Sequence, residues 1–177
     1  MSPPMTGRLL GKVFLVTGGG TGIGRAICLS AAREGADVCI ACHASVEGAR
    51  AVKREILSLG RRAAVLRADI GIARQARALV GRAFVEMGAL HVLVNNAAIV
   101  RCAPFLEYRL EDWEATFAIN LRAAFLCARG FAAVSSTYRP SAVCSRTPIS
   151  APTTHQRLAW TCSPGARPQR WGPGGSR

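Results

Sequence analysis

The residues best suited to chemistry form a glycine cluster near the N-terminus. The sequence TGGGTGIG occupies residues 17–24 and lies between an apolar run and a segment with helical spacing. In this setting Gly18 permits a tight turn, Gly22 lets the backbone approach a pyrophosphate, and Gly24 allows a helix to pack closely on a strand. The unpaired N–H groups and the dipole of the helix N-terminus then attract phosphates. The cluster therefore predicts a dinucleotide site, and the alternative is a flexible glycine turn without a ligand.

The elements that would position this turn alternate along the chain up to about residue 129. Short apolar runs predict strands over residues 12–17, 37–41, 63–67 and 91–95. Helical spacing predicts helices over residues 23–34, 46–59, 76–87 and 112–129, the last of them burying Trp113, Phe117, Leu121 and Ala124. This alternation predicts an α/β fold, a doubly wound parallel sheet of the Rossmann type.

The composition changes after residue 129. All 10 Asp and Glu residues lie at or before Glu114, and the remainder is rich in Pro, Arg and Ser without a strand or helix period. Such a segment buries too little apolar surface to offset its ordering entropy. We therefore predict a dinucleotide-binding domain over residues 9–129 and a disordered basic tail over residues 130–177.

The net charge of +13 is interpreted as a property of that tail, so we expect no nucleic-acid partner. No apolar run approaches the roughly 18 residues of a membrane span. The early VFLV run is too short for a signal peptide. No membrane association is expected, and the expected location is cytoplasmic.

The 7 cysteines are an odd number scattered among apolar residues, which favours reduced buried thiols over a disulfide framework. Cys39 and Cys42 form a C-x-x-C pair inside a predicted strand. Residues three apart in a strand point to opposite faces, so the two thiols would chelate poorly. No metal site is expected.

The glycine spacing G-x-x-x-G-x-G resembles the short-chain dehydrogenase/reductase family, and three further features lie at that family's positions. The resemblance implies that Asp69 bonds the adenine ring and that Asn120 takes part in the proton relay. It also implies that the NNAA segment after the fourth strand, residues 95–98, supports the sheet and lines the cofactor, although the family has N-N-A-G and Ala98 replaces its last glycine. The alternatives are that Asp69 caps the next helix and that Asn120 is an ordinary polar residue. The implied cofactor-binding residues are Gly18, Thr21, Gly22, Ile23, Gly24, His43, Ser45, Asp69, Ile70, Asn96, Ala97 and Ala98.

The segment after the second strand bears on the choice of cofactor. An enzyme that uses NAD usually places an acid there to bind the ribose 2′-OH. This chain has no acid between Ala41 and Glu47, whereas His43 and Ser45 could meet a 2′-phosphate. We therefore expect NADP, with NAD the less favoured cofactor.

The resemblance also implies a catalytic tyrosine followed four residues later by a lysine, and this pair is missing. The lysines are Lys12 and Lys53, and neither follows Tyr108 or Tyr138 by four residues. Only strands in the order 3-2-1-4 are expected, with the fourth strand an exposed apolar edge. The family is usually homo-oligomeric, and the helix that carries Asn120 would lack part of that interface.

Three functions are compatible with this pattern. The family implies an NAD(P)-dependent oxidoreductase acting on a small alcohol or carbonyl, with this chain inactive because the Tyr–Lys pair is missing. The alternatives are a non-catalytic nucleotide-binding module or a subunit that pairs with an intact homologue, and an unstable product of a damaged gene. In the last case the tail would be read in a shifted frame, since shifted codons across residues 152–157 permit Y-N-A-S-K and those across 133–140 permit G-I-V-N-I-S-S.

Overall fold

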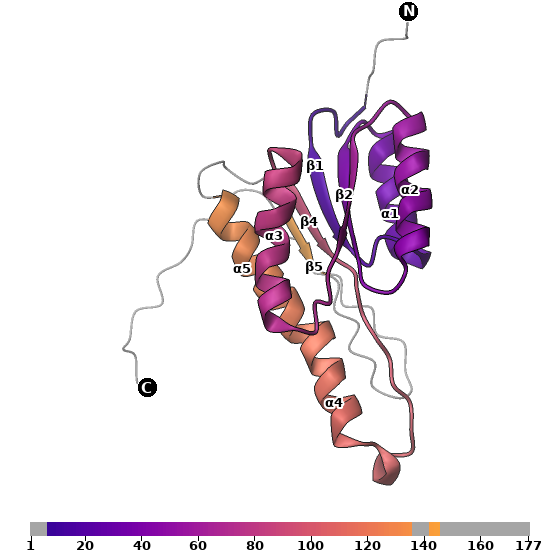
Figure 1. Ribbon diagram of the computed structural model, residues 1–177, viewed down its shortest axis with the longest axis vertical. Coiled ribbons are helices and arrows are strands. Elements are labelled where there is room, and N and C mark those ends of the chain that lie inside the picture. The colour runs from indigo at the N-terminus through magenta and orange to yellow at the C-terminus, as the bar shows by residue number, and fades with distance from the viewer. Residues whose placement is uncertain (1–6, 136–141, 146–177) are drawn as a thin grey trace, which may run out of the picture.

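The computed structural model describes residues 7–135 and 142–145, which form one sheet between two layers of helices (Figure 1). The strands are β1 Val13–Thr17, β2 Asp37–Cys42, β3 Ala63–Arg67, β4 Val92–Asn95 and β5 Ala142–Ser145. The helices are α1 Gly22–Arg33, α2 Val46–Ser58, α3 Ala73–Met87, the short 3₁₀ helix η1 Phe105–Glu107, α4 Leu110–Phe117, the π-helical turn η2 Ala118–Ala123 and α5 Ala124–Ser135. Every strand and helix predicted before residue 96 is present, with ends that differ by a few residues at most.

The strand order is β3-β2-β1-β4-β5, and every neighbouring pair is parallel. The predicted order 3-2-1-4 and the Rossmann-type α/β fold are therefore confirmed. β5 was not expected, and it pairs with β4 from Val92↔Ala142 to Asn95↔Ser145. The expectation that β4 is an exposed edge is wrong, because β5 covers it.

The boundary expected at residue 129 also differs from the structure. α5 continues to Ser135, and its Phe131 is fully buried in the core. Burial of this aromatic ring stabilises one more turn of helix beyond the boundary that the change in composition predicted. The remaining residues of the expected tail, 136–141 and 146–177, lie outside the described residues. Most of the shifted-frame segments lie there too, so that hypothesis stays a prediction.

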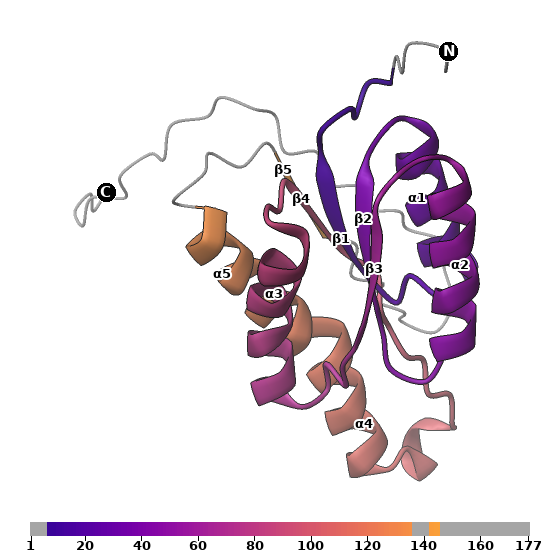
Figure 2. The same ribbon diagram turned by 45° about the horizontal axis from the view of Figure 1, so that its top comes forward.

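Two hydrophobic clusters lie on opposite faces of the sheet, because successive strand residues point to opposite sides. α1 and α2 cover the face that carries Val16 and Ile40, and α3 and α5 cover the face that carries Leu15 (Figure 2). Cys39 belongs to the second face and Cys42 to the first, as the strand period predicts. The two thiols therefore cannot bind the same metal ion.

The helix that runs through α4, η2 and α5 buries a different face from the one predicted. Trp113, Phe117 and Leu121 are 53%, 43% and 54% exposed, and Ala124 is half-buried. The buried positions are instead Ala123, Leu126, Cys127 and Phe131. The reason is that α5 packs on α3 and β4 whereas α4 extends beyond the sheet (Figure 1). The apolar side chains of α4 therefore have no layer to cover them within the described residues.

This helix is also long and apolar enough over Leu110–Val134 to cross a membrane, by length and composition alone. The core helix of a globular domain passes the same test. Here α5 contributes Cys127 and Phe131, both with no exposed surface, to the cluster under the sheet. Only 22% of the apolar window is buried, however, so this packing accounts for a minor share of the apolar composition.

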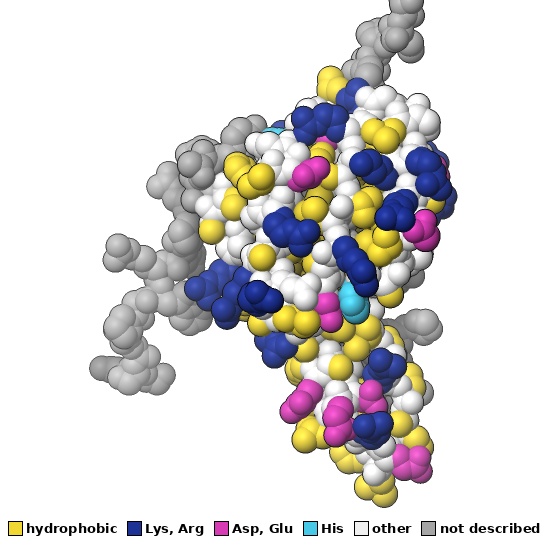
Figure 3. Space-filling view, viewed as in Figure 1, with side chains coloured by type: hydrophobic (Ala, Val, Ile, Leu, Met, Phe, Trp, Pro, Cys, Tyr) yellow, Lys and Arg dark blue, Asp and Glu magenta, His cyan; other side chains and the backbone are white. Residues whose placement is uncertain are grey.

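The excess of positive charge is not confined to the tail, which corrects our interpretation of the net charge. Dark blue side chains spread over α2 and α3, and magenta ones gather on α4 (Figure 3). On α3 the cations Arg74, Arg77 and Arg82 are accompanied by Glu86 alone, whereas α4 carries Glu111, Asp112 and Glu114. The domain itself therefore has a basic end and an acidic end.

A buried histidine joins the amino ends of β1 and β4. Nδ1 of His91 accepts a hydrogen bond of 2.9 Å from the Val13 N–H, and the His91 N–H donates to the Val13 carbonyl at 2.9 Å. Nδ1 accepts only in the neutral ring. Burial and the charge of Lys12 both lower the pKa of His91 from its ordinary 6.5.

We expect this contact to weaken the fold at acidic pH. The lowered pKa means that unfolded His91 takes up a proton that the folded residue resists, so its contribution is complete above about pH 6.5 and is lost as the pH falls. His91→Asn keeps an acceptor oxygen that does not titrate at these pH values. Urea unfolding at about pH 7 and about pH 5 should show a smaller loss of stability in this variant than in the wild type. Equal losses would contradict the role of His91.

Candidate cofactor-binding site

The glycine turn between β1 and α1 has the backbone geometry that its sequence predicts. Gly18 and Gly22 have φ of +67° and +52°, in the left-handed region that favours glycine. A Cβ at Gly24 would overlap the carbonyl oxygen of Gly18, so the first turn of α1 packs directly against the end of β1. The Gly19 N–H donates to the Ala41 carbonyl at 3.2 Å, which ties the turn to the end of β2.

The N-terminus of α1 is open to an anion. Thr21 is its N-cap residue, and the Thr21 side chain makes no capping hydrogen bond. The first turn of α1 contains no acidic residue. Ile23 is 55% exposed beside this turn. Free N–H groups and the positive end of the helix dipole therefore face outward, as phosphate binding requires.

A buried hydroxyl fastens the turn to the segment after β4. Thr17 is 2% exposed, and its Oγ1 accepts hydrogen bonds from the N–H groups of Asn96 at 3.0 Å and Ala97 at 3.1 Å. The same hydroxyl donates to the Val94 carbonyl at 3.3 Å. Nδ2 of Asn96 donates in return to the carbonyls of Thr17 and Gly18, at 3.0 and 3.3 Å. The two segments therefore form one rigid unit.

The NNAA segment lies where the resemblance expects it. A Cβ on Gly18 would meet the Cα of Ala97 at 3.0 Å, so Asn96 and Ala97 pack on the glycine turn. Ala98 is exposed next to them. β1 and β4 are neighbours from which the chain crosses over in opposite directions, and ligands of such sheets bind at this point.

A second group of predicted residues lies at the ends of β2 and β3. His43, Arg67, Asp69 and Gln75 help to line a pocket of about 360 Å³. Nε2 of His43 lies 3.8 Å from Oδ2 of Asp69. The structure therefore brings together two residues, His43 and Asp69, that lie far apart in the sequence.

Asp69 does not cap α3, which was the alternative for this residue. Its Oδ1 accepts a hydrogen bond from the Gly71 N–H at 2.9 Å, and the N-cap of α3 is Ile72. Oε1 of Gln75 accepts from the Asp69 N–H at 2.9 Å. The carboxylate is thus held at the mouth of the pocket with Oδ2 toward His43. Ile70 turns away and packs against the core.

Ser45 links this pocket to the glycine turn. It is the N-cap of α2, and it makes no capping hydrogen bond with its side chain. A Cβ on Gly20 would lie 2.7 Å from both the carbonyl oxygen and Oγ of Ser45. Ser45 therefore lies against the middle of the turn, between the helix N-terminus and the pocket of His43.

Asn120 occupies the π-helical turn η2, a type of turn that is frequent at functional sites. Its Oδ1 accepts from the Ile99 N–H at 2.9 Å, and its Nδ2 donates to the Ile99 carbonyl at 2.8 Å. The side chain thus holds the segment that follows the NNAA motif. Asn120 is therefore more than an ordinary polar residue on a helix.

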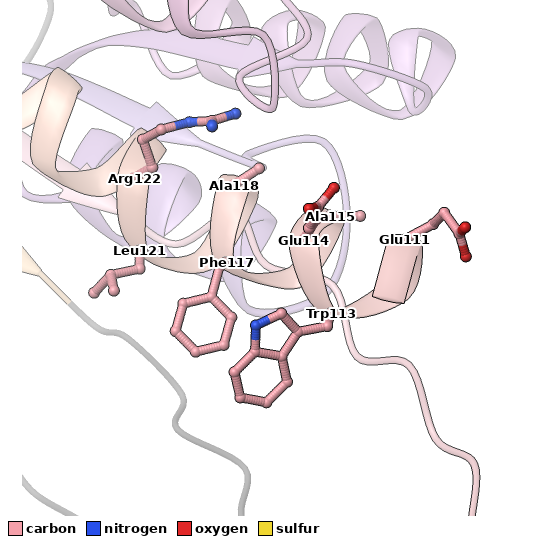
Figure 4. A pocket seen from close by; sticks show the side chains of 8 residues that line it. All are labelled: Glu111, Trp113, Glu114, Ala115, Phe117, Ala118, Leu121 and Arg122. Atoms are coloured by element: carbon pink, nitrogen blue, oxygen red, sulfur yellow. The ribbon is translucent and has the colours of Figure 1, made fainter. Parts of the chain in front are cut away.

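A second hollow, larger than the pocket of His43 and Asp69, lies elsewhere, along α4 and η2. Trp113, Phe117 and Leu121 project from one side of the helix (Figure 4). Arg122 projects from the other side (Figure 4). Its Nη2 donates to the Gly71 carbonyl at 2.8 Å. The hollow follows the exposed apolar stripe and is separate from the predicted cofactor-binding residues. The expectation about an oligomer interface here stays a prediction.

Three residues of the site were missed at the level of sequence. Thr17 was expected at the end of a strand, Gln75 lies one residue before the predicted helix 76–87, and Arg67 was expected at the end of a strand. A polar residue at the end of a buried run was the available signal for Thr17, since buried hydroxyls require partners. Gln75 and Arg67 gave no comparable signal.

The fold and the site together define a dinucleotide-binding Rossmann domain. The family model for short chain dehydrogenases matches residues 12–137, and the chain belongs to this family. Similar proteins include the hydroxynaphthalene reductase of Aspergillus fumigatus, 38% identical over 68% of this chain and 44% of the relative. The 3-oxoacyl-[acyl-carrier-protein] reductase of Synechocystis is 36% identical over 68% of this chain and 49% of the relative.

Solved structures support the same assignment. A short chain dehydrogenase from Burkholderia cenocepacia in complex with NADP is 42% identical with a TM-score of 0.70, over 72% of this chain and 52% of that one. A blue fluorescent protein from a metagenomic library, in complex with NADPH, is 41% identical with a TM-score of 0.68, over 71% and 51%. The chain spans about half the length of the curated relatives it matches.

Proposed function

We propose that this chain is the NADP-binding part of a short-chain dehydrogenase that transfers hydride to or from a small alcohol or carbonyl. The observation that carries the proposal is the open N-terminus of α1 beside the pocket of His43 and Asp69. Phosphates fit the first feature and an adenosine the second. The end of β2 carries no acid for a ribose 2′-OH, which favours NADP over NAD.

The residues of this chain bind and orient the cofactor. The N–H groups at the start of α1 hold the pyrophosphate, and Asp69 with the neighbouring pocket holds the adenine. Thr17 and Asn96 keep the glycine turn and the NNAA segment at a fixed separation, so that the cofactor meets a preformed surface. Bound NADP supplies or accepts the hydride.

We further propose that the chain with this sequence does not complete the reaction. A proton must pass to or from the substrate oxygen, and in this family a tyrosine with a lysine four residues later does so. Neither Lys12 nor Lys53 stands in that relation to a tyrosine. The alternatives, a subunit that pairs with an intact homologue and the product of a damaged gene, share the same cofactor site.

Calorimetry with the purified full chain tests binding. We expect NADP⁺ to bind more tightly than NAD⁺, and a panel of ketones to leave the rate of NADPH oxidation at the background level. If neither dinucleotide binds, or if NAD⁺ binds more tightly than NADP⁺, the cofactor assignment is contradicted. Ketone-dependent oxidation that disappears in Asn120→Ala would contradict the assignment as inactive.

A further inference from the structure

The carboxyl ends of β2 and β3 place an arginine beside the adenosine pocket. Arg67 is the last residue of β3 and pairs with Cys42, the last residue of β2. Arg67 lines the same pocket as His43 and Asp69. Burial raises the pKa of the Cys42 thiol, and the charges of Arg67 and Arg50 both oppose this rise. Two cations therefore act on the end of β2, where the acid that would bind a ribose 2′-OH is missing.

The two cations differ in their partners. Nη1 of Arg50 lies 2.6 Å from Oε1 of Glu47, in an ion pair within α2. In the part of the chain that the structure describes, Arg67 has no carboxylate within ion-pair distance. The Arg67 carbonyl accepts from Nη1 of Arg82 at 3.3 Å, which fixes the strand end and leaves the guanidinium free.

The nearby carboxylate of Asp69 forms no ion pair with Arg67 among the described residues. Oδ1 of Asp69 is occupied by the Gly71 N–H, and Oδ2 faces His43. Arg67 is exposed at the pocket, so its guanidinium reaches an anion there without a large desolvation cost. A phosphate matches a guanidinium with two parallel hydrogen bonds, which an exposed hydroxyl cannot do.

We propose that Arg67, assisted by His43, binds the 2′-phosphate of NADP and is the residue that sets the preference of this chain for NADP over NAD. The inference rests on the proposed function, because it requires that the adenosine of a dinucleotide occupies the pocket. The competing interpretation is that Arg67 is a solvated arginine at the end of a strand. The two interpretations make different predictions for the loss of Arg67. The proposal predicts weaker binding of NADP alone, and the competing interpretation predicts no change in the binding of either dinucleotide.

Calorimetry on the full chain with NADP⁺, NAD⁺ and adenosine 2′,5′-bisphosphate separates them. We expect Arg67→Gln to weaken NADP⁺ and adenosine 2′,5′-bisphosphate by about 10- to 100-fold, the usual effect of losing a charge-assisted pair, and to leave NAD⁺ unchanged. His43→Gln should have a smaller effect in the same direction. Arg54→Gln is the matched control, since it removes the same charge from an exposed position of α2 outside the pocket.

Each outcome bears on the proposal. An Arg67→Gln variant that binds NADP⁺ as tightly as the wild type overturns the role of Arg67, and so does one that loses NADP⁺ and NAD⁺ equally. If Arg54→Gln weakens the binding of NADP⁺ as much as Arg67→Gln does, net charge alone would explain the effect. That result would overturn the proposal as well. A wild type that binds no dinucleotide contradicts the proposed function itself. Circular dichroism confirms that each variant is folded.

Discussion

Gly22→Trp should abolish measurable binding of NADP, with a loss of at least about a hundredfold in affinity, while the domain stays folded. Gly22 has a φ of +52°, and a Cβ there would meet nothing within 4 Å. A side chain at this position therefore projects into open space over the N-terminus of α1, where we place the pyrophosphate. An indole ring would occupy that space and cover the N–H groups that the phosphates need.

The cost of the substitution to the fold is set by the backbone, about 1–2 kcal/mol for a side chain in the left-handed region. Gly60→Trp is the matched control, because Gly60 has a φ of +73° and equally open surroundings at the end of α2. Both variants should lose a similar amount of stability in urea unfolding. Only Gly22→Trp should lose the binding of NADP that calorimetry measures. Full retention of NADP by Gly22→Trp would place the cofactor elsewhere.

Thr17→Val should destabilise the domain strongly, by roughly 2–4 kcal/mol in the free energy of unfolding. The valine methyl fills the volume of the hydroxyl but cannot accept hydrogen bonds. The N–H groups of Asn96 and Ala97 would then lose their acceptor, and each buried unpaired N–H costs about 1–3 kcal/mol.

Thr17→Ser keeps the hydroxyl and removes one methyl group, at a cost of about 1 kcal/mol. Urea unfolding followed by circular dichroism compares the two variants directly. If the valine variant is as stable as the serine variant, the hydroxyl does not hold the two segments together. The valine variant should also bind NADP more weakly, since the glycine turn would move relative to the NNAA segment.

The sheet could be predicted from the sequence because the glycines that end its connecting helices are local signals. Gly35, Gly60 and Gly88 follow the first three helices, and each has a positive φ. Such glycines end helices wherever they lie, and the apolar runs between them are too short for anything but strands. The strand order, by contrast, was implied by the resemblance to the short-chain dehydrogenase/reductase family and not by these local signals.

The last helix could not be predicted as well, because a stripe of apolar residues does not say which layer will cover it. Trp113, Phe117 and Leu121 have helical spacing, yet α4 extends past the sheet and leaves them exposed. Of the residues that do reach the core, Phe131 lies where the composition had already changed, whereas Ala123, Leu126 and Cys127 lie before that point. Composition reports an average over many residues, whereas burial depends on one contact.

The candidate cofactor-binding residues could be proposed from the sequence where a motif fixes backbone geometry, and were missed where a side chain acts through a distant partner. Gly18, Gly22 and Gly24 are recognisable from spacing alone. Thr17 and Gln75 are polar residues with many ordinary roles, and only the folded chain shows that Thr17 reaches Asn96 and that Gln75 holds Asp69. Assignment of such residues requires tertiary structure.

The hydrogen bonds from Asn96 and Ala97 to Thr17 have a consequence for the order of events during synthesis on the ribosome. They join residues 79 and 80 positions apart, so the proposed phosphate site is incomplete until β4 has left the exit tunnel. β1, β2 and β3 can pair earlier, through short crossovers. One side of β1 therefore stays unpaired while they do, and nucleotide cannot assist this stage. A pause in translation before residue 97 would expose an apolar strand to chaperones or to other nascent chains.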